Sequence, residues 1–183
     1  MTTEAQAIAD TQAWVERAVI GLNLCPFAKA VVSKQQVRYV VSMDSEPEQV
    51  LKILQAEMQH LLDTDAAVLD TTLLIAPKLL PDFLAFNEFL FDCDSVLMSM
   101  GLQGVLQIAD FHPRFQFAGT HADDISNFTN RSPYPTLHLL REDSVDKAVA
   151  AFPDASQIYE KNVAQLEALG REGWEALGLK GGG

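Results

Sequence analysis

The chain has 183 residues, 48% hydrophobic and 21% charged, a balance typical of one folded domain rather than of a disordered segment. Its formal net charge of −12 disfavours binding to nucleic acid or to an anionic membrane surface, because both repel a negative protein. No stretch reaches the roughly eighteen apolar residues of a membrane-spanning helix, and the acidic first residues do not resemble a signal peptide. Two cysteines are too few for a disulfide framework, so the sequence predicts a cytoplasmic protein.

The first half of the chain predicts helices and strands in alternation. Apolar residues recur at helical spacing over about 4–24, and a strand is expected at 36–42. A second helix is expected from Ser45 to about Leu62, because Ser45 and Glu48 have the spacing of a capping box. The short apolar run at 71–77 lies between turn residues and predicts a buried strand.

The second half continues the alternation. The strongest helix signal lies in 81–101, where apolar residues repeat at spacings of three and four before a terminal glycine. Strands are predicted at 104–111 and 135–142. A short helix is expected over 143–152, and a last helix is expected to begin at Asp154.

These elements predict a single α/β domain over residues 1–170. The expected architecture is a sandwich in which helices flank a small, about four-stranded sheet that is mixed or mostly parallel. Residues 171–183 are expected to form a loosely held tail.

Residues 112–134 lack the periodicity of a helix or a strand. Unstructured segments longer than about 12 to 15 residues are usually functional or disordered in compact domains. This one contains four aromatic residues and two prolines, with Pro135 directly after it, which favours an ordered loop. We expect it to pack over the carboxyl ends of the strands, where open α/β sheets bind ligands.

Four residues are candidates for catalysis. Strand alternation brings Asp110 and His112 to one face about 7 Å apart, so His112 could act as general acid or base with Asp110 as its orienting partner. His138 lies mid-strand and is either catalytic or a hydrogen-bonded core histidine. Cys25 precedes Pro26 near the expected start of a helical turn, and is either a nucleophile or redox thiol, or a buried structural cysteine. Cys25 with His112 or His138 would form a nucleophile–base pair.

A second group of residues is suited to an anion. The segment 110–141 has a formal charge of zero in a strongly acidic chain, and arginine matches the geometry of carboxylate and phosphate. The predicted ligand is therefore an anionic small molecule. Its expected binding residues are Asn127, Asn130, Arg131, Ser132 and Arg141. Alternatively, Arg131 pairs with Asp123 or Asp124 and only holds the loop together.

Other ligands are less well supported by the sequence. Several His, Cys and Asp residues could bind a metal, but no closely spaced ligand pair is present, so no metal ligand is predicted. The glycines form neither a phosphate-binding loop nor a dinucleotide fingerprint, so the sequence predicts no particular cofactor. The aromatic residues of the loop could serve a contact between two copies of the chain as well as a pocket.

Three stretches, "LNLCPFA", "FHPRFQFAG" and "NFTNRSPYPTLHLLRE", resemble the bacterial proteins grouped as domain-of-unknown-function family 1415. The similarity extends over nearly the whole chain. The resemblance implies no activity, substrate or cofactor. It marks seven residues as matching the family pattern, namely Cys25, His112, Asn130, Arg131, Ser132, His138 and Arg141.

The sequence therefore predicts a cytoplasmic enzyme that acts on a small anionic metabolite at the loop in 110–141. The main alternative is a non-catalytic binding module for an anionic ligand or a protein partner. A metal-dependent enzyme is the third possibility.

Overall fold

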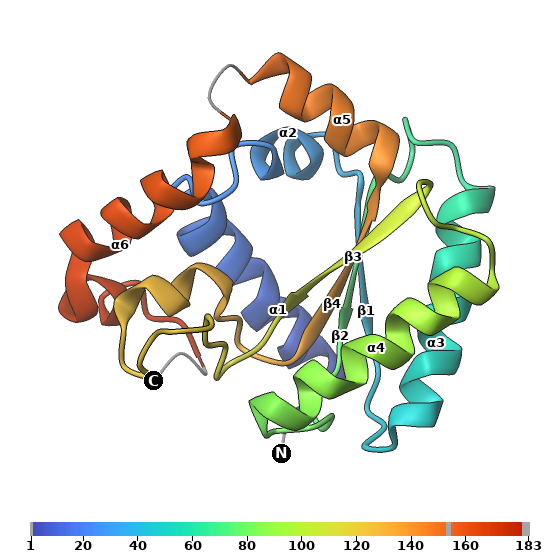
Figure 1. Ribbon diagram of the computed structural model, residues 1–183, viewed down its shortest axis with the longest axis horizontal. Helices are drawn as coiled ribbons and strands as arrows, with labels where there is room; N and C mark the ends of the chain where they lie inside the picture. Colours follow the sequence, from blue (N-terminus) through green and yellow to red (C-terminus); the bar gives the residue numbers. More distant parts are fainter. Residues whose placement is uncertain (1, 153–154, 181–183) are drawn as a thin grey trace.

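The computed structural model of the chain describes residues 2–152 and 155–180, and it contains one four-stranded sheet with helices on both faces (Figure 1). The strands are β1 (Val37–Val41), β2 (Thr71–Ile75), β3 (Leu106–Phe111) and β4 (Thr136–Arg141). Their order across the sheet is β1-β2-β4-β3. β1 and β2 are parallel, whereas β4 is antiparallel to both of its neighbours, so β3 runs in the same direction as β1 and β2. The predicted α/β fold with a mixed sheet is confirmed.

One face of the sheet is covered by α3 (Pro47–Asp63) and α4 (Phe83–Ser99). The apolar stripe predicted for α4 is confirmed, since its buried residues are spaced three or four apart, and Asp82 caps its first turn by accepting a bond from Ala85 N at 3.0 Å. Gly101 has φ 69° directly after this helix, the left-handed conformation that ends many helices. Leu54, Leu74 and Leu137 are among the residues that form the core between these helices and the sheet.

The other face is covered by α1 (Glu4–Trp14), the π-helix η1 (Val15–Ile20), α2 (Ala28–Ser33), α5 (Glu142–Ala151) and α6 (Ile158–Glu175). Two 3-10 helices, η2 (Ile125–Asn130) and η3 (Ala155–Gln157), complete the fold. The core on this face contains Trp14, Leu73, Phe128 and Trp174. It is less continuous than the core on the α3 and α4 face, because α2 and α5 contain no buried residue.

Several boundaries differ from those predicted. The helix expected over 4–24 changes at Val15 into a π-helix and ends at Ile20. No capping box forms at Ser45, because α3 begins at Pro47 with Glu46 as its N-cap, and the Ser45 hydroxyl bonds to the Glu46 carboxylate instead. The start expected at Asp154 lies outside the described residues.

Residues 171–180 are packed against the domain rather than loosely held. Trp174 is 2% exposed and meets Phe128 edge-on, with ring centroids 5.1 Å apart. The Arg17 guanidinium also donates a bond of 3.1 Å to the carbonyl of Leu177. These contacts differ from the prediction because Trp174, with the partly buried Leu177 and Leu179, packs against the core on this face and orders the terminal segment.

Candidate functional site

The loop between β3 and β4 is ordered by hydrogen bonds among its own residues. Asn127 is fully buried, and its side-chain oxygen accepts bonds from Phe117 N and the Thr120 hydroxyl, both at 2.9 Å. Its amide group donates to the carbonyl of His121 at 2.8 Å. These three bonds fix the loop around η2, so the expectation of an ordered loop agrees with this geometry.

Two further residues predicted to bind a ligand have partners within the protein. The Ser132 hydroxyl donates to the carbonyl of Tyr134 at 2.6 Å, and Ser132 is 1% exposed. The Asn130 amide donates to the carbonyl of Asp110 at 3.4 Å, and its oxygen accepts from Thr129 at 2.9 Å. Both side chains therefore connect the loop to itself or to β3.

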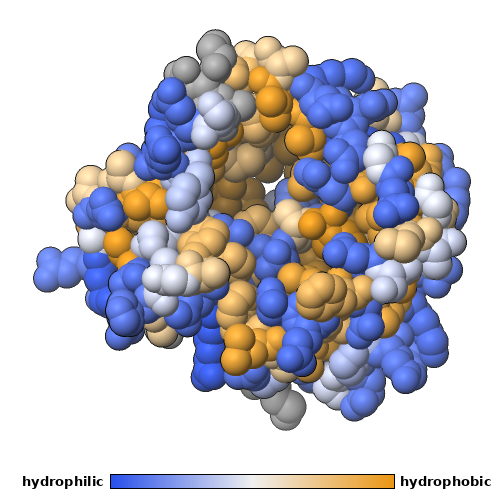
Figure 2. Space-filling model, viewed as in Figure 1, coloured by the Kyte–Doolittle hydropathy of each residue, from blue (hydrophilic) through white to orange (hydrophobic). Residues whose placement is uncertain are grey.

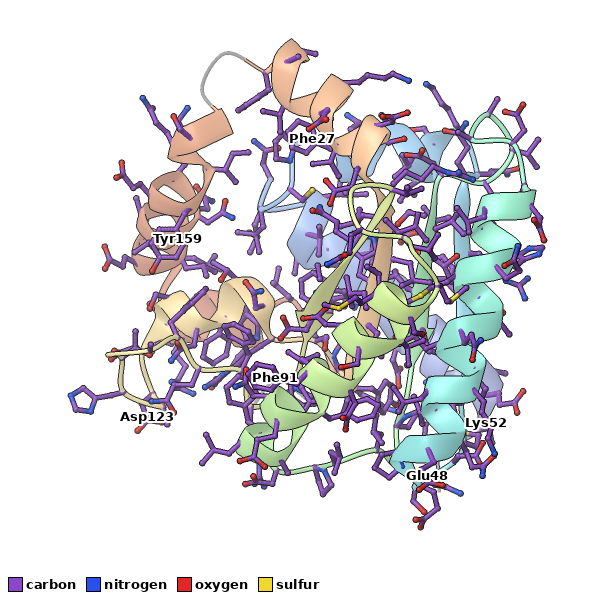
Figure 3. The ribbon with its side chains drawn as sticks, turned by 45° about the vertical axis from the view of Figure 1, so that its right-hand side comes forward. Phe27, Glu48, Lys52, Phe91, Asp123 and Tyr159 are labelled. Atoms are coloured by element: carbon purple, nitrogen blue, oxygen red, sulfur yellow. The ribbon has the colours of Figure 1, made fainter. Side chains whose placement is uncertain are left out.

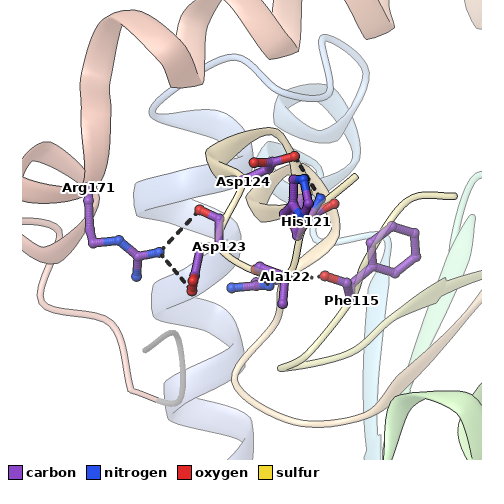
Figure 4. A network of polar contacts seen from close by, with 8 residues as sticks. Phe115, His121, Ala122, Asp123, Asp124 and Arg171 are labelled. Carbon is purple, nitrogen blue, oxygen red and sulfur yellow. Dashed lines mark hydrogen bonds and ion pairs between the residues drawn. The ribbon is translucent and has the colours of Figure 1, made fainter. Parts of the chain in front are cut away.

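Arg131 is a buried residue of the same loop. It donates to the carbonyls of Phe115 and Ala122 at 3.1 and 2.5 Å, and its guanidinium lies 4.3 Å above the ring of Phe128. Burial, followed by the nearby charge of Arg171, lowers the pKa of Arg131. Asp123, one of the two predicted partners of Arg131, forms its ion pair with Arg171 at 3.7 Å instead (Figure 4).

Arg141 lies at the opposite end of β4 from the loop. Its guanidinium donates to the carbonyls of Leu61, Thr64 and Leu69, at distances of 2.5 to 3.3 Å. The first two belong to the carboxyl end of α3, where a positive charge is favourable because of the helix dipole. Arg131 and Arg141 are therefore separated by the length of β4 and do not form one clamp.

His112 is 1% exposed and faces α4. Its ring lies 4.9 Å from that of Phe86, and Nδ1 accepts a bond from Arg114 N at 3.0 Å. Nε2 then carries the hydrogen and donates it to the carbonyl of Leu80 at 3.1 Å. Both nitrogens have partners, and burial lowers the pKa of this histidine. Asp110 shares this face of the sheet, and burial raises the pKa of its carboxyl group.

The aromatic residues of the loop pack within the molecule. Phe115 lies 5.2 Å from Phe83 of α4 and 4.8 Å from Phe117, as measured between ring centroids. Phe117 in turn meets Tyr159 of α6 at 5.4 Å. This row of rings joins the loop to helices on both sides of it.

A cavity of about 610 Å³ lies on the other face of the sheet, beneath α2 and α5. It lies near the amino ends of β1 and β2 and extends along β3 from Gln107 to Phe111. Figure 2 shows a hollow in this part of the molecule with apolar residues along its rim. Most of its wall is apolar, formed by residues such as Val15, Val19, Val31, Val37, Val145 and Phe152. Figure 3 shows Phe27 next to α5, where its ring meets that of Phe152 at 5.9 Å.

The floor of the cavity is the sheet itself. In the central row, Tyr39, Leu73, His138 and Ala109 lie side by side on the four strands. Thr71 and Gln107 lie in the next row and also contribute to the wall. Ala109 is the smallest of these residues, so it leaves free space on the edge strand beside His138.

Two of the predicted catalytic residues, Cys25 and His138, line this cavity. His138 bonds through Nε2 to the Thr71 hydroxyl at 2.6 Å, and burial lowers its pKa to about 4. Cys25 is a half-exposed free thiol, two residues before Phe27, the N-cap of α2. The sheet separates both residues from His112 and Asp110, so Cys25 shares a site with His138 and not with His112.

The charge in the cavity is small. Among the described residues of the wall, Asp70 is the only charged one. Its carboxylate accepts a hydrogen bond of 2.6 Å from the Ser144 hydroxyl. Burial, followed by the charge of Glu16, raises the pKa of Tyr39, so its hydroxyl stays protonated at neutral pH. The side chains of Tyr39 and Gln107 have no hydrogen-bond partner among the described residues.

The sequence did not predict Tyr39, Gln107 and Ala109 as site residues. One signal was present in the sequence, since residues 28–33 and 142–151 are rich in valine and alanine, and the structure leaves Ala28, Val31, Val32, Val145 and Ala148 half-buried. The face of the sheet that these helices cover depends on the chain topology, which that signal does not contain.

The described residues contain no further candidate site of two common kinds. No group of three or more His, Cys, Asp and Glu side chains in 2–152 and 155–180 is arranged to hold a metal ion. Over the same residues, no helix combines the length and apolar character needed to cross a membrane.

A family model described as "Protein of unknown function (DUF1415)" matches residues 6–176. No curated protein and no solved structure matches the chain. The match covers the cavity, the loop and all nine residues predicted from the sequence.

Proposed function

The chain belongs to the DUF1415 family, and because this family's description assigns no activity, we propose a function from the geometry: the protein binds a small, uncharged and mainly apolar molecule in the cavity beneath α2 and α5. The cavity is the observation that carries the proposal. Its volume of about 610 Å³ falls in the range of roughly 300 to 1,000 Å³ that is usual for small-molecule sites. An apolar wall with a few polar groups is also the usual composition of such sites.

The polar groups of the cavity support an uncharged ligand. Its wall contains no Lys or Arg among the described residues, so a bound anion would lose its hydration without gaining an opposite charge. Arg131 and Arg141, which the sequence predicts as anion-binding residues, donate instead to backbone carbonyls elsewhere in the fold. An anion at the loop would have to compete with those bonds.

The same geometry favours binding over nucleophilic catalysis. His138 is the histidine that lines the same cavity as Cys25. A histidine with a pKa of about 4 is a weak base, so it is poorly suited to remove a proton from a nucleophile at neutral pH. The wall therefore offers hydrogen bonds more readily than acid-base chemistry.

The test uses N-phenyl-1-naphthylamine, an uncharged dye that fluoresces in apolar surroundings. We expect it to bind the protein and to lose at least about tenfold in affinity in Ala109→Leu, because the added side chain would fill the cavity floor beside His138. The matched control is Ala56→Leu, which makes the same change at an exposed position of α3. The control should bind the dye as the parent protein does.

An anionic analogue separates the cavity from the loop. The dye 1-anilinonaphthalene-8-sulfonate has the same ring system with an added sulfonate group, and we expect it to bind more weakly. Tighter binding of the sulfonate that is lost in Arg131→Met and kept in Ala109→Leu would refute the proposal and favour an anion site at the loop. Equal binding of the neutral dye to Ala109→Leu and the parent protein would also refute it.

A further inference from the structure

The hydrogen bonds of His138 fix the position of its proton. The Thr71 hydroxyl lies 2.6 Å from His138 Nε2 and 2.6 Å from the carbonyl oxygen of Leu139. A carbonyl can only accept, so the single hydroxyl hydrogen of Thr71 is donated to Leu139. The hydroxyl oxygen then accepts from His138, which means that Nε2 carries the ring hydrogen and Nδ1 carries a lone pair.

The lone pair of Nδ1 is free for a ligand. Within the described ranges, 2–152 and 155–180, His138 bonds only through Nε2. His138 is half-buried and lines the cavity, and its pKa of about 4 keeps the ring neutral at physiological pH. A neutral imidazole nitrogen in an apolar wall is a hydrogen-bond acceptor, and it gains most from a partner that arrives with a donor.

The neighbours of His138 leave room for such a donor. Ala109 lies directly beside it on β3, and Gln107 lies diagonally two residues before Ala109. Diagonal neighbours in a sheet are about 7 to 8 Å apart, a distance that one small ligand can span. Leu73 lies on the other side of His138, on β2, so the ligand would meet an apolar surface there.

We propose that the ligand of this cavity is an uncharged, mainly apolar molecule that donates a hydrogen bond from a hydroxyl or N–H group to Nδ1 of His138. This inference rests on the proposed function and adds the chemical class of the ligand. Phenols, alcohols and indole-like heterocycles belong to this class, whereas hydrocarbons, ethers and carboxylates do not.

The experiment compares probes that differ only in the donor. Indole and 1-methylindole have nearly the same size and apolar surface, but methylation removes the N–H group. Phenol and anisole form a second such pair, and indole-3-carboxylate adds a negative charge. Binding to the full chain would be followed by two-dimensional NMR titration, and the ring nitrogen signals of His138 would report its proton position directly.

We expect indole and phenol to bind about five- to tenfold more tightly than their methylated partners, the effect of one neutral hydrogen bond. His138→Phe keeps a ring of similar size without the acceptor, so it should make the two members of each pair equal. Thr71→Val removes the group that fixes the ring hydrogen at Nε2 and should also reduce the preference. The second variant and the probe pairs on the parent protein keep the test decisive if His138→Phe does not fold.

The outcomes separate the two proposals. If indole and 1-methylindole bind the parent protein equally in the cavity, the role of His138 is refuted while the apolar site stands. If none of the uncharged probes shifts a cavity resonance, both the inference and the proposed function are refuted. Tighter binding of indole-3-carboxylate than of indole would refute the requirement for an uncharged ligand.

Discussion

At the residue scale, the two buried histidines make stability depend on pH. Burial lowers the pKa of His138 from 6.5 to about 4, and it also lowers the pKa of His112. Below pH 6.5 the unfolded chain binds protons at these rings that the folded chain does not bind. Their contribution to the free energy of unfolding is therefore complete above pH 6.5, the pKa in the unfolded chain, and decreases as the pH falls from 6.5 towards 4. Asp110 has a raised pKa, so its contribution has the opposite sign.

The first prediction isolates His138 from the other groups. Between about pH 7 and pH 5, its contribution to the free energy of unfolding should decrease by about 2 kcal/mol. Urea unfolding of the parent protein and of His138→Phe would measure this, and the variant should lose about 2 kcal/mol less over that range. Parallel curves for the two proteins would show that His138 does not titrate as its burial implies.

The second prediction concerns the two thiols. Burial, followed by the charges of Asp94 and Asp92, raises the pKa of Cys93 to about 12, and Cys93 is fully buried in α4. Cys25 is half-exposed at the cavity. One thiol should therefore react with iodoacetamide in the native protein, and peptide mass spectrometry should identify it as Cys25. Cys25→Ser should abolish native labelling, and labelling of Cys93 before unfolding would contradict this expectation.

The sequence could predict which residues carry polar chemistry better than it could predict what they contact. The sequence favoured His112 as the catalytic histidine because it lies at a strand end, and left His138, which lies mid-strand, as either catalytic or a core residue. Their difference comes from the carbonyl of Leu80 and the amide of Arg114, which complete the bonds of His112. Those partners depend on the path of two loops, and local periodicity does not encode that path.

At the element scale, Arg141 joins β4 to the carboxyl end of α3. Its guanidinium donates to three carbonyls, and removing it would leave these partly buried acceptors without partners. The third prediction is that Arg141→Met lowers the free energy of unfolding by about 2 to 3 kcal/mol. Chemical denaturation would measure the loss.

The matched control for Arg141→Met is Arg171→Met. Arg171 forms an ion pair with Asp123 whose side chains are 45% and 99% exposed (Figure 4). Exposed pairs contribute little to stability, so the control should unfold nearly as the parent protein does. Equal losses in the two variants would mean that the carbonyl contacts of Arg141 are not important for the stability of α3.

Elements were predictable where local signals agreed with one another. α4 has an apolar stripe, an aspartate cap and a terminal glycine, and its predicted bounds are within two residues of the observed ones. The start of α3 was predicted one residue too early. Pro47, which suits the first helical position, begins the helix, so Glu46 and not Ser45 is the N-cap. The π-helix η1 follows α1 without any break in the apolar pattern, so the sequence gives no sign of it.

At the scale of the whole molecule, the segment near the carboxyl end is fixed by contacts with distant parts of the chain. Trp174 near the carboxyl end is buried against Phe128, and Arg17 of η1 donates to the carbonyl of Leu177. The fourth prediction is that Trp174→Ala lowers the free energy of unfolding by about 3 to 5 kcal/mol, the usual cost of truncating a buried aromatic side chain. Thermal and urea unfolding would measure it. A change near zero would favour the loosely held tail that the sequence suggested.

The mixed sheet was predictable as a class but its strand order was not. Alternating strands and helices favour parallel pairing, and β1 and β2 follow that rule. β4 enters the sheet between β2 and β3 in the reverse direction, after a loop that has no helix long enough for a crossover. Reversed strands have the same alternation of apolar residues as parallel ones, so the pattern of β4 cannot reveal its direction.

The helices α2 and α5 contain no buried residue, so the core on their side of the sheet is less complete than the core under α3 and α4. Several of their apolar side chains line the cavity of about 610 Å³. A molecule that fills this space would supply the missing packing and raise the free energy of unfolding through its binding. If the protein binds such a ligand as proposed, the fraction of chains open to proteases in a cell would fall as the ligand accumulates, so the amount of the protein would follow the supply of that ligand.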